Sequence, residues 1–190
     1  MTAFRELSQH LLDIFENSVT AGASLVHIDI QEDFERDRLS ITVEDNGRGM
    51  DKEMLARLAD PWVTTRTTRK VGLGIPFFKQ SAEMCNGSFE IISEVGKGTR
   101  TRATFQHSHI DRPPLGDLVG TLICMLVGNP KVDIVYRHRV DGKEFLLETR
   151  EIREILGEDI SLSDPEVLAF LRSMLEEGLH SLGGEPLSGM

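Results

Sequence analysis

The amino-acid sequence predicts an α+β fold, on three observations. Apolar residues recur at helical spacing in residues 4–20 and again in residues 75–84. Alternating polar and apolar residues are typical of half-buried strands. They fill four runs, at 25–30, 39–45, 88–94 and 98–105. Glycine-containing segments separate these runs, as turns do.

The first three predicted elements place polar side chains on defined faces of a helix and a strand. In the helix at 4–20, one face is apolar, and His10, Asp13 and Asn17 lie on the other side. The chain turns at 21–23 and enters the strand at 25–30. In the strand at 39–45, Asp45 shares the side of the apolar residues, so we expect its carboxylate to point into the interior.

The middle of the chain predicts a short helix, a long loop and a buried helix. Residues 51–60 suit the short helix, and residues 61–71 are polar without periodicity, which is typical of a lid loop. The buried helix begins just after Gly74, and Pro76 is tolerated in its first turn because the missing amide is not needed there. A glycine turn at 95–98 joins the last two strands of this part.

The last third predicts a small α+β extension at 115–190, which follows a larger domain at 1–106 and a linker at 107–114. It contains an apolar helix at 115–126, strands at 132–139 and 144–149 joined by an Asp141-Gly142 turn, and a final helix after a capping box at 163–166. We expect this extension to pack on the first domain, to form a homodimer or to dock another protein.

Composition excludes several classes of function. The 190 residues carry a formal charge of -10, and both halves are acidic, which disfavours nucleic-acid binding. The three cations Arg66, Arg69 and Lys70 are a local exception. Two distant cysteines, no basic leader and no apolar run of membrane-spanning length predict a cytoplasmic protein that does not bind membranes. His107 and His109 could form a metal pair, but without a third ligand nearby they are more often incidental.

Three separated segments predict one nucleotide pocket: DIFEN at 13–17, EDNGRGM at 44–50 and VGLGI at 71–75. Asp45 can accept a hydrogen bond from a purine amino group, and Gly47 and Gly49 let the base approach bare main chain. This arrangement selects adenine. A helix-capping role is the alternative for Asp45, but it explains neither glycine.

Residues 7–106 resemble the ATP-binding domain of the GHKL superfamily, which gyrase, heat-shock chaperones, histidine kinases and mismatch-repair ATPases share. FENSVTAGAS at 15–24 is similar to the mismatch-repair branch, whereas DPWVTTRTTRKVGLGIPFFKQ and GSFEIISEVGKGT are similar to histidine kinases. The resemblance implies a two-layer α/β sandwich (the Bergerat fold), in which helices cover one face of a mixed, mostly antiparallel sheet. It also implies ATP and Mg²⁺ as ligands.

The resemblance assigns the adenine and metal contacts residue by residue. Asn17 would bind Mg²⁺ through its amide oxygen, although a helix-surface asparagine is the alternative. Asp45 would accept from the adenine amino group, with Thr99 completing that end. Met50 would pack on the base, and core packing alone would also account for this methionine.

The phosphate end follows from the same resemblance. The amides of Gly72, Leu73 and Gly74, at the start of a helix, would face the phosphates. Lys70 stands where the family often has a further glycine, and both Lys70 and Arg66 could reach the phosphates. Asp13 holds the position of the catalytic glutamate in hydrolytic members but is one methylene shorter, so slow turnover or binding alone is expected.

Two functions remain open. The favoured one is a nucleotide-dependent regulatory switch, in which ATP orders the loop at 60–71 and changes how the C-terminal region meets a protein partner. The alternative is a trans-acting protein kinase similar to anti-sigma factor kinases. Sensor kinases carry an acceptor histidine ahead of the ATP domain, and only about ten residues precede the core of the first helix here. We therefore expect any acceptor to be another protein.

Overall fold

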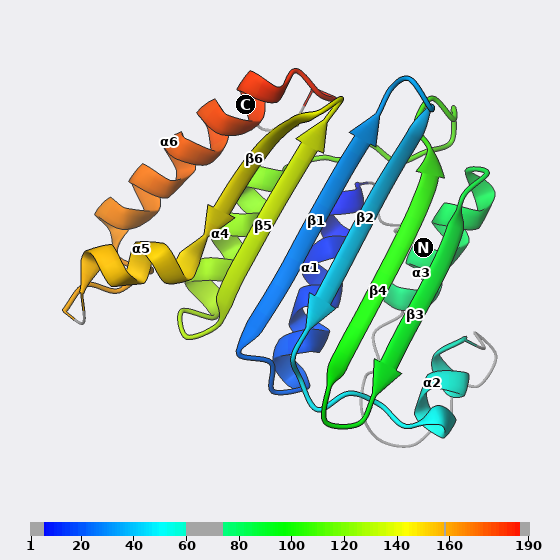
Figure 1. Ribbon diagram of the computed structural model, residues 1–190, viewed down its shortest axis with the longest axis horizontal. Helices are drawn as coiled ribbons and strands as arrows, with labels where there is room; N and C mark the ends of the chain where they lie inside the picture. The colour runs from blue at the N-terminus through cyan, green and yellow to red at the C-terminus, as the bar shows by residue number, and fades with distance from the viewer. Residues whose placement is uncertain (1–5, 60–73, 158, 187–190) are drawn as a thin grey trace.

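The computed structural model describes residues 6–59, 74–157 and 159–186, and within them one mixed sheet of six strands runs in the order β3-β4-β2-β1-β5-β6 (Figure 1). The strands are β1 (Leu25–Asp33), β2 (Arg38–Asp45), β3 (Ser88–Glu94), β4 (Gly98–Gln106), β5 (Asp133–Val140) and β6 (Lys143–Glu148). Four of the five pairings are antiparallel, and β1 and β5 are parallel. The predicted mixed, mostly antiparallel sheet is confirmed.

The helices form the second layer of the fold. They are α1 (Leu7–Thr20), α2 (Lys52–Ala59), α3 (Gly74–Met84), α4 (Leu118–Gly128), α5 (Thr149–Leu156) and α6 (Pro165–Leu182). In Figure 1, α1, α3 and α4 lie together behind the sheet, and α1 contacts both of the others. Helix α6 contacts α4 and the outer strands β5 and β6. The predicted two-layer sandwich is confirmed.

One hydrophobic core serves both the predicted ATP-binding domain and the predicted extension. The inward apolar residues of β1 and β2 are at most 2% exposed, as their alternation predicts. Phe15 of α1, Leu122 of α4 and Tyr136 of β5 belong to the same cluster. The division of the sequence at 106 and 115 stays a prediction, and the strands of the extension continue the sheet of the first domain.

The start of α1 is held by the predicted linker rather than by a side-chain cap. The first amides of a helix have no partner inside it and need an external acceptor. Here the amide groups of Leu7 and Ser8 donate to the carbonyl oxygens of Pro114 and Leu115, both at 2.9 Å. The helix that carries Asp13 and Asn17 is therefore anchored on the segment that leads into the C-terminal region.

The structure of the C-terminal region differs from the sequence prediction at two places. Helix α5 was not predicted, because β6 ends at Glu148 and α5 begins at Thr149 with no turn residue between them. The final helix is capped by Asp164, whose Oδ1 accepts from the Glu166 amide at 2.9 Å, and not by Ser163. Pro165 occupies the first turn, so the extended residue directly before it becomes the cap.

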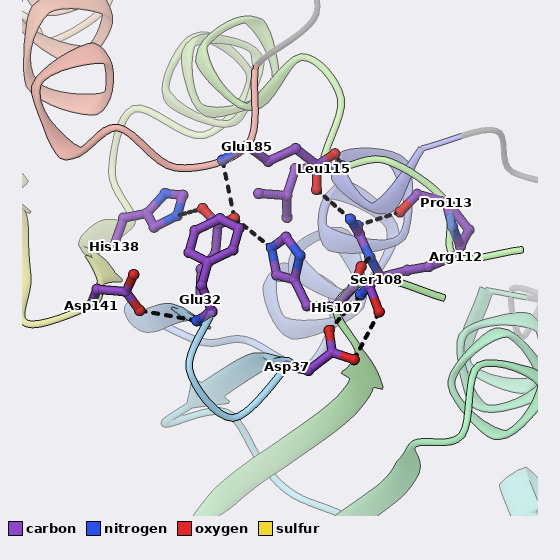
Figure 2. A network of polar contacts seen from close by, with 11 residues as sticks. Glu32, Asp37, His107, Ser108, Arg112, Pro113, Leu115, His138, Asp141 and Glu185 are labelled. Carbon is purple, nitrogen blue, oxygen red and sulfur yellow. Dashed lines mark hydrogen bonds and ion pairs between the residues drawn. The ribbon is translucent and has the colours of Figure 1, made fainter. Parts of the chain in front are cut away.

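A buried polar network joins the far ends of β1, β4 and β5 to the chain after α6 (Figure 2). Glu32 is 1% exposed, and its two carboxylate oxygens bond His107 Nε2 at 2.8 Å and His138 Nε2 at 2.9 Å. Burial opposes ionisation of Glu32, but the hydrogen bonds from His138 and His107 hold its pKa below the usual value. The Glu185 amide also donates to Glu32, at 3.1 Å, so the network fastens the end of the described chain to the sheet.

Two further features were checked on the described residues. No helix among them is both long and apolar enough to cross a membrane. Cys85 is buried, Cys124 is exposed, and both are free thiols.

Candidate nucleotide site

Asp45 lies buried at the end of β2 with both carboxylate oxygens hydrogen-bonded. The residue is 8% exposed, as its place in the strand alternation predicts. Its Oδ1 accepts from the Gly47 amide at 2.9 Å, and its Oδ2 accepts from the Ser18 hydroxyl at 2.7 Å. The two bonds fix the plane of the carboxylate at the junction of β2 and α1. Ser18 directly follows Asn17, so this contact links two of the predicted motifs.

Thr99 and Met50 are brought to the same end of the sheet as Asp45. Thr99 is the partner of Asp45 in the β2–β4 register. The Ser93 hydroxyl accepts from the Met50 amide at 2.8 Å and contacts the Thr99 hydroxyl at 2.9 Å. Ser93 therefore ties the loop after β2 to the strands β3 and β4.

Gly49 is required by a close approach of the main chain. Its φ is +65°, which residues with a side chain rarely adopt, and a Cβ atom would lie 2.0 Å from the Glu94 carbonyl oxygen. The loop after β2 thus packs against the turn between β3 and β4. The neighbouring contact between the Gly96 amide and the Arg48 carbonyl oxygen, at 2.8 Å, holds the same two segments together.

Asp13 lies against the first residue of α3. A Cβ atom on Gly74 would be 1.4 Å from Asp13 Oδ2, so any side chain at position 74 would force this carboxylate to turn away. Oδ2 is shielded from solvent and has no hydrogen-bond partner among the described residues. Burial, and to a smaller extent the charge of Glu16, raise the pKa of Asp13. A carboxylate that lacks partners and has a raised pKa is suited to accept a proton.

Asn17 follows Asp13 by one turn of α1, and its side chain is partly exposed. The i, i+4 spacing places the two residues on one side of the helix, as predicted. An amide oxygen beside a carboxylate is a donor set of the hard, oxygen type that Mg²⁺ prefers. The predicted base, Asp13, thus lies beside the start of α3, and the predicted metal ligand follows one turn further along α1.

Four predicted phosphate contacts, Arg66, Lys70, Gly72 and Leu73, lie outside the described residues, as does the predicted loop at 60–71. Of the predicted glycine hinge, the structure places Gly74. The predicted site residues that the structure describes fall into two groups. Asp45, Gly47, Gly49, Met50 and Thr99 surround the end of β2. Asp13 of α1 lies against Gly74 of α3, and Asn17 follows Asp13 by one turn of α1.

The predicted alternative of a metal pair at His107 and His109 finds no support in the geometry. His107 bonds Glu32, whereas His109 Nδ1 accepts from the Asp111 amide at 3.2 Å. Ligand-type atoms of Glu32, His107 and Glu185 do lie within 4.8 Å of one another. However, Glu185 already accepts from Arg112 at 2.6 Å and from the Leu115 amide at 2.9 Å, so these groups form a closed hydrogen-bond network.

Sequence reasoning missed or misplaced three residues of this region. Ser18 and Ser93 are small polar residues that carry no motif, although each occupies a position next to a predicted site residue in the helix or the strand register. His10 was placed on the polar side of the first helix, yet it is 2% exposed. The correction has a physical reason, since α3 packs on this side of α1 and covers it.

Comparisons with known proteins identify the family of the chain. Residues 2–109 match the family model described as histidine kinase-, DNA gyrase B-, and HSP90-like ATPase. The chain is 32% identical over 125 residues to a non-motile and phage-resistance protein of Caulobacter vibrioides, which covers 61% of this chain and 15% of that protein. It is 35% identical over 78 residues to a probable C4-dicarboxylate sensor kinase of Bacillus subtilis, covering 41% of this chain and 15% of that one.

The fold also has a solved counterpart. The crystal structure of the N-terminal domain of a DNA repair protein is similar to this chain with a TM-score of 0.52 at 16% identity, over 77% of this chain and 53% of the other. At this identity the similarity concerns the fold. The matched family model spans more than half of the sequence and includes every predicted site residue. The chain therefore belongs to the histidine kinase-, DNA gyrase B- and HSP90-like ATPase family.

Proposed function

We propose that this chain binds MgATP and acts as a nucleotide-dependent regulatory switch with slow or no hydrolysis. The observation that carries the proposal is Asp45, a carboxylate that is buried, held in one orientation by Ser18 and the Gly47 amide, and opposite Thr99. Each carboxylate oxygen has a second lone pair, so Asp45 can also accept from the amino group of adenine. A guanine presents a carbonyl oxygen at that position, and two acceptors would face each other.

The residues between α1 and α3 fit the phosphate end of the same ligand. Asn17 would hold Mg²⁺ through its amide oxygen, and the start of α3 at Gly74 would face the phosphates. When bound, MgATP would supply the phosphoryl group and a divalent cation that offsets its negative charge. The remaining predicted contacts, Arg66, Lys70, Gly72 and Leu73, belong to this end in the proposal.

Slow hydrolysis follows from the identity and surroundings of Asp13. A general base must reach the attacking water within about 3 Å, directly or through one further water. Asp13 has a shorter side chain than glutamate, and its Oδ2 is packed against the position of Gly74. The raised pKa favours proton transfer to Asp13, while the short reach limits it. The raised pKa and the short reach of Asp13 together suit a protein that binds ATP but hydrolyses it slowly.

The switch part of the proposal is supported by how α1 is anchored. The helix that carries Asn17 begins on the carbonyl groups of Pro114 and Leu115. The Leu115 amide in turn donates to Glu185, beyond α6. A shift of α1 upon nucleotide binding would therefore move the segment that leads into the C-terminal region. We propose that this region presents the surface for a protein partner or for a second copy of the chain.

The sequence similarity to a probable sensor kinase favours one alternative, a protein kinase that acts on a separate acceptor. ATP labelled in its terminal phosphate distinguishes the two functions. Label transferred to a co-purified protein supports the kinase, whereas label retained as ATP or released as phosphate supports the switch.

Calorimetry with ATP, ADP and GTP, each with and without Mg²⁺, tests the proposed site. We expect ATP and ADP to bind, ATP affinity to rise with Mg²⁺, and GTP to bind about five- to 150-fold more weakly, because a mismatched acceptor pair costs about 1 to 3 kcal/mol. Equal affinities for ATP and GTP would refute recognition by Asp45.

A further inference from the structure

Three polar side chains form a row across the sheet at the end where the base is proposed to bind. Asp45 of β2 is the register partner of Thr99 of β4, and Thr99 is the register partner of Ser93 of β3. Residues directly opposite each other on antiparallel strands place their side chains on the same face, close enough to interact. Asp45 is buried, and the other two residues are half-buried. Thr99 therefore stands between the carboxylate of Asp45 and the hydroxyl of Ser93.

The Ser93 hydroxyl makes three contacts. It accepts from the Met50 amide at 2.8 Å and donates to the Gly98 carbonyl oxygen at 3.1 Å. It also lies 2.9 Å from the Thr99 hydroxyl oxygen. A serine hydroxyl has one proton and two lone pairs, so it can donate once and accept twice. The three contacts use this capacity completely.

These contacts leave one direction for the hydrogen bond between Ser93 and Thr99. A backbone amide can only donate, and a carbonyl oxygen can only accept. The Met50 amide therefore takes one lone pair of Ser93, and the Gly98 carbonyl takes its proton. The remaining lone pair accepts from the Thr99 hydroxyl. The series of hydrogen bonds thus runs from Thr99 through Ser93 to Gly98.

This series commits the single proton of Thr99 and leaves only lone pairs of its hydroxyl for a ligand. The neighbouring carboxylate of Asp45 also offers only acceptors. The end of the proposed pocket that meets position 6 of a purine would then present acceptors from two strands and no hydroxyl donor. The amino group of adenine donates at that position. The 6-oxo group of guanine or hypoxanthine accepts, and it would face further acceptors.

We infer that Ser93 is a positioning residue for specificity: it holds the Thr99 hydroxyl as an acceptor and thereby makes the site select a 6-aminopurine over a 6-oxopurine. The inference rests on the proposed function. It adds to Asp45 a second acceptor, whose orientation is set by a residue that itself makes no contact with the nucleotide.

ITP is the probe that tests this role of Ser93. It carries a 6-oxo group in place of the amino group of ATP, and it lacks the 2-amino group of GTP, so the comparison concerns the edge of the base around position 6. Calorimetry in the presence of Mg²⁺ measures both affinities. In Ser93→Ala, the Thr99 hydroxyl can turn its proton toward the ligand. We expect the ratio of ATP affinity to ITP affinity to fall by about three- to tenfold, the usual range for one hydrogen bond.

Two variants of the same strand are the controls. Ser93→Thr retains the hydroxyl at a strand position that tolerates a β-branched residue, and it should keep the ratio of the unmodified protein. Ser88→Ala removes a hydroxyl at the other end of β3. Ser88 lies 2.8 Å from the hydroxyl of its register partner Thr104, in the same kind of cross-strand pair. We expect Ser88→Ala to bind ATP and ITP as the unmodified protein does.

A loss of ATP and ITP affinity by the same factor in Ser93→Ala would overturn the inference. It would show that Ser93 supports the loop at Met50 and does not set the direction of the Thr99 hydroxyl. The ratio is the deciding quantity because a merely structural role would leave it unchanged. A fall of the ratio in Ser93→Thr as large as in Ser93→Ala would also overturn the inference, since the retained hydroxyl would then have no effect.

A measurement without nucleotide keeps the two proposals distinguishable. If the unmodified protein bound neither ATP nor ITP, the proposed function would fail, and the contact between the two hydroxyls would still be tested. Urea unfolding of Ser93→Ala, Thr99→Val and the double variant forms a double-mutant cycle. We expect the double variant to lose less stability than the sum of the single variants. Additive losses would show that the hydroxyls do not interact and would refute the inference.

Discussion

The two aspartates of the site, Asp45 and Asp13, are both carboxylates shielded by neighbouring elements, and they differ in how their oxygens are satisfied. Asp45 accepts from Ser18 and from the Gly47 amide. Asp13 Oδ2 is buried without a partner among the described residues, and its pKa is raised. A carboxylate with both oxygens bonded is held in one orientation, whereas one with an unbonded oxygen is ready to take up a proton or a ligand.

This difference suits the two aspartates to different tasks, namely recognition of the base and activation of water. Discrimination between purines requires that an acceptor stay in place, because a mobile group could adapt to the wrong base. Activation of water requires an acceptor whose hydrogen-bonding capacity is unused. Asp45 has the surroundings that suit the first task, and Asp13 those that suit the second.

The largest effect is expected from Gly49→Ala, which disturbs the end at Asp45. The new Cβ would lie 2.0 Å from the Glu94 carbonyl oxygen, and φ is +65°. We expect the free energy of unfolding to fall by about 2 to 4 kcal/mol and ATP binding to be lost, because a main-chain clash cannot be relieved by a side-chain rotation. Urea unfolding and calorimetry measure the two effects.

Gly96→Ala is the matched control for this substitution. Gly96 also has a positive φ, of +81°, but nothing lies within 4 Å of its Cβ position. Only the conformational cost of about 1 kcal/mol should remain, with ATP affinity retained. Equal losses of stability in the two variants would show that the contact with Glu94 has no special weight.

A second effect, of up to roughly 3 kcal/mol, is expected from pH through His10. Its folded pKa of about 4 lies below the ordinary value of 6.5, so the unfolded chain binds the proton more readily. Stability from this residue is complete above pH 6.5 and is lost as the pH falls toward 4, at about 1.4 kcal/mol per pH unit. Asp13, whose pKa is raised, acts in the opposite direction.

Comparison with His10→Phe isolates this contribution, since every other titrating group is shared. We expect the difference in the free energy of unfolding between the unmodified protein and the variant to shrink between pH 6.5 and 4.5. Urea unfolding at a series of pH values measures it. A difference that stays constant with pH would show that His10 can be protonated in the folded state without cost.

The third effect is on adenine recognition, through Asp45→Asn. The asparagine amide would present a donor toward the Gly47 amide or the Ser18 hydroxyl, which both donate to Asp45, or toward the adenine amino group that we propose Asp45 to bind. We expect ATP affinity to fall by about 1 to 3 kcal/mol. Asp111→Asn, an exposed aspartate in the linker, is the control and should bind ATP as the unmodified protein does. Full affinity in Asp45→Asn would end the assignment of Asp45.

The sequence predicted the Asp45 end well because a strand has a period of two. Alternation alone placed Asp45 on the buried side of β2. It could not predict Ser93, because the link to Met50 and Thr99 depends on the pairing of β3 with β4 and on the loop after β2. Contacts between distant segments are set by tertiary packing, which leaves no local pattern.

The surroundings of α1 were harder to predict from the sequence, for a related reason. The apolar face of α1 is evident from its period, but α3 covers the polar side as well, so His10 is buried against expectation. A polar residue at a helix–helix contact has the same local sequence as a surface residue. Helix α5 was missed because a helix that follows a strand without a turn has no start signal.

The smallest effect is expected at the other end of the comparison, from Asp13→Asn. ATP binding should be retained, and any hydrolysis should fall by about tenfold, or about 1.4 kcal/mol in the barrier. This is less than general bases usually contribute, since the shorter side chain limits its reach. Because a partly buried charge without partners opposes folding, the nucleotide-free variant should gain about 0.5 to 1 kcal/mol in stability.

Glu16→Gln is the control, since Glu16 is exposed on the same helix and affects Asp13 only through its charge. Its removal should bring the pKa of Asp13 slightly nearer to the usual value and leave hydrolysis nearly unchanged. Unchanged turnover in Asp13→Asn would remove Asp13 from the mechanism. A gain in stability without loss of hydrolysis would mean that its unbonded oxygen reflects packing against Gly74 and not chemistry, and the contrast with Asp45 would then concern structure alone.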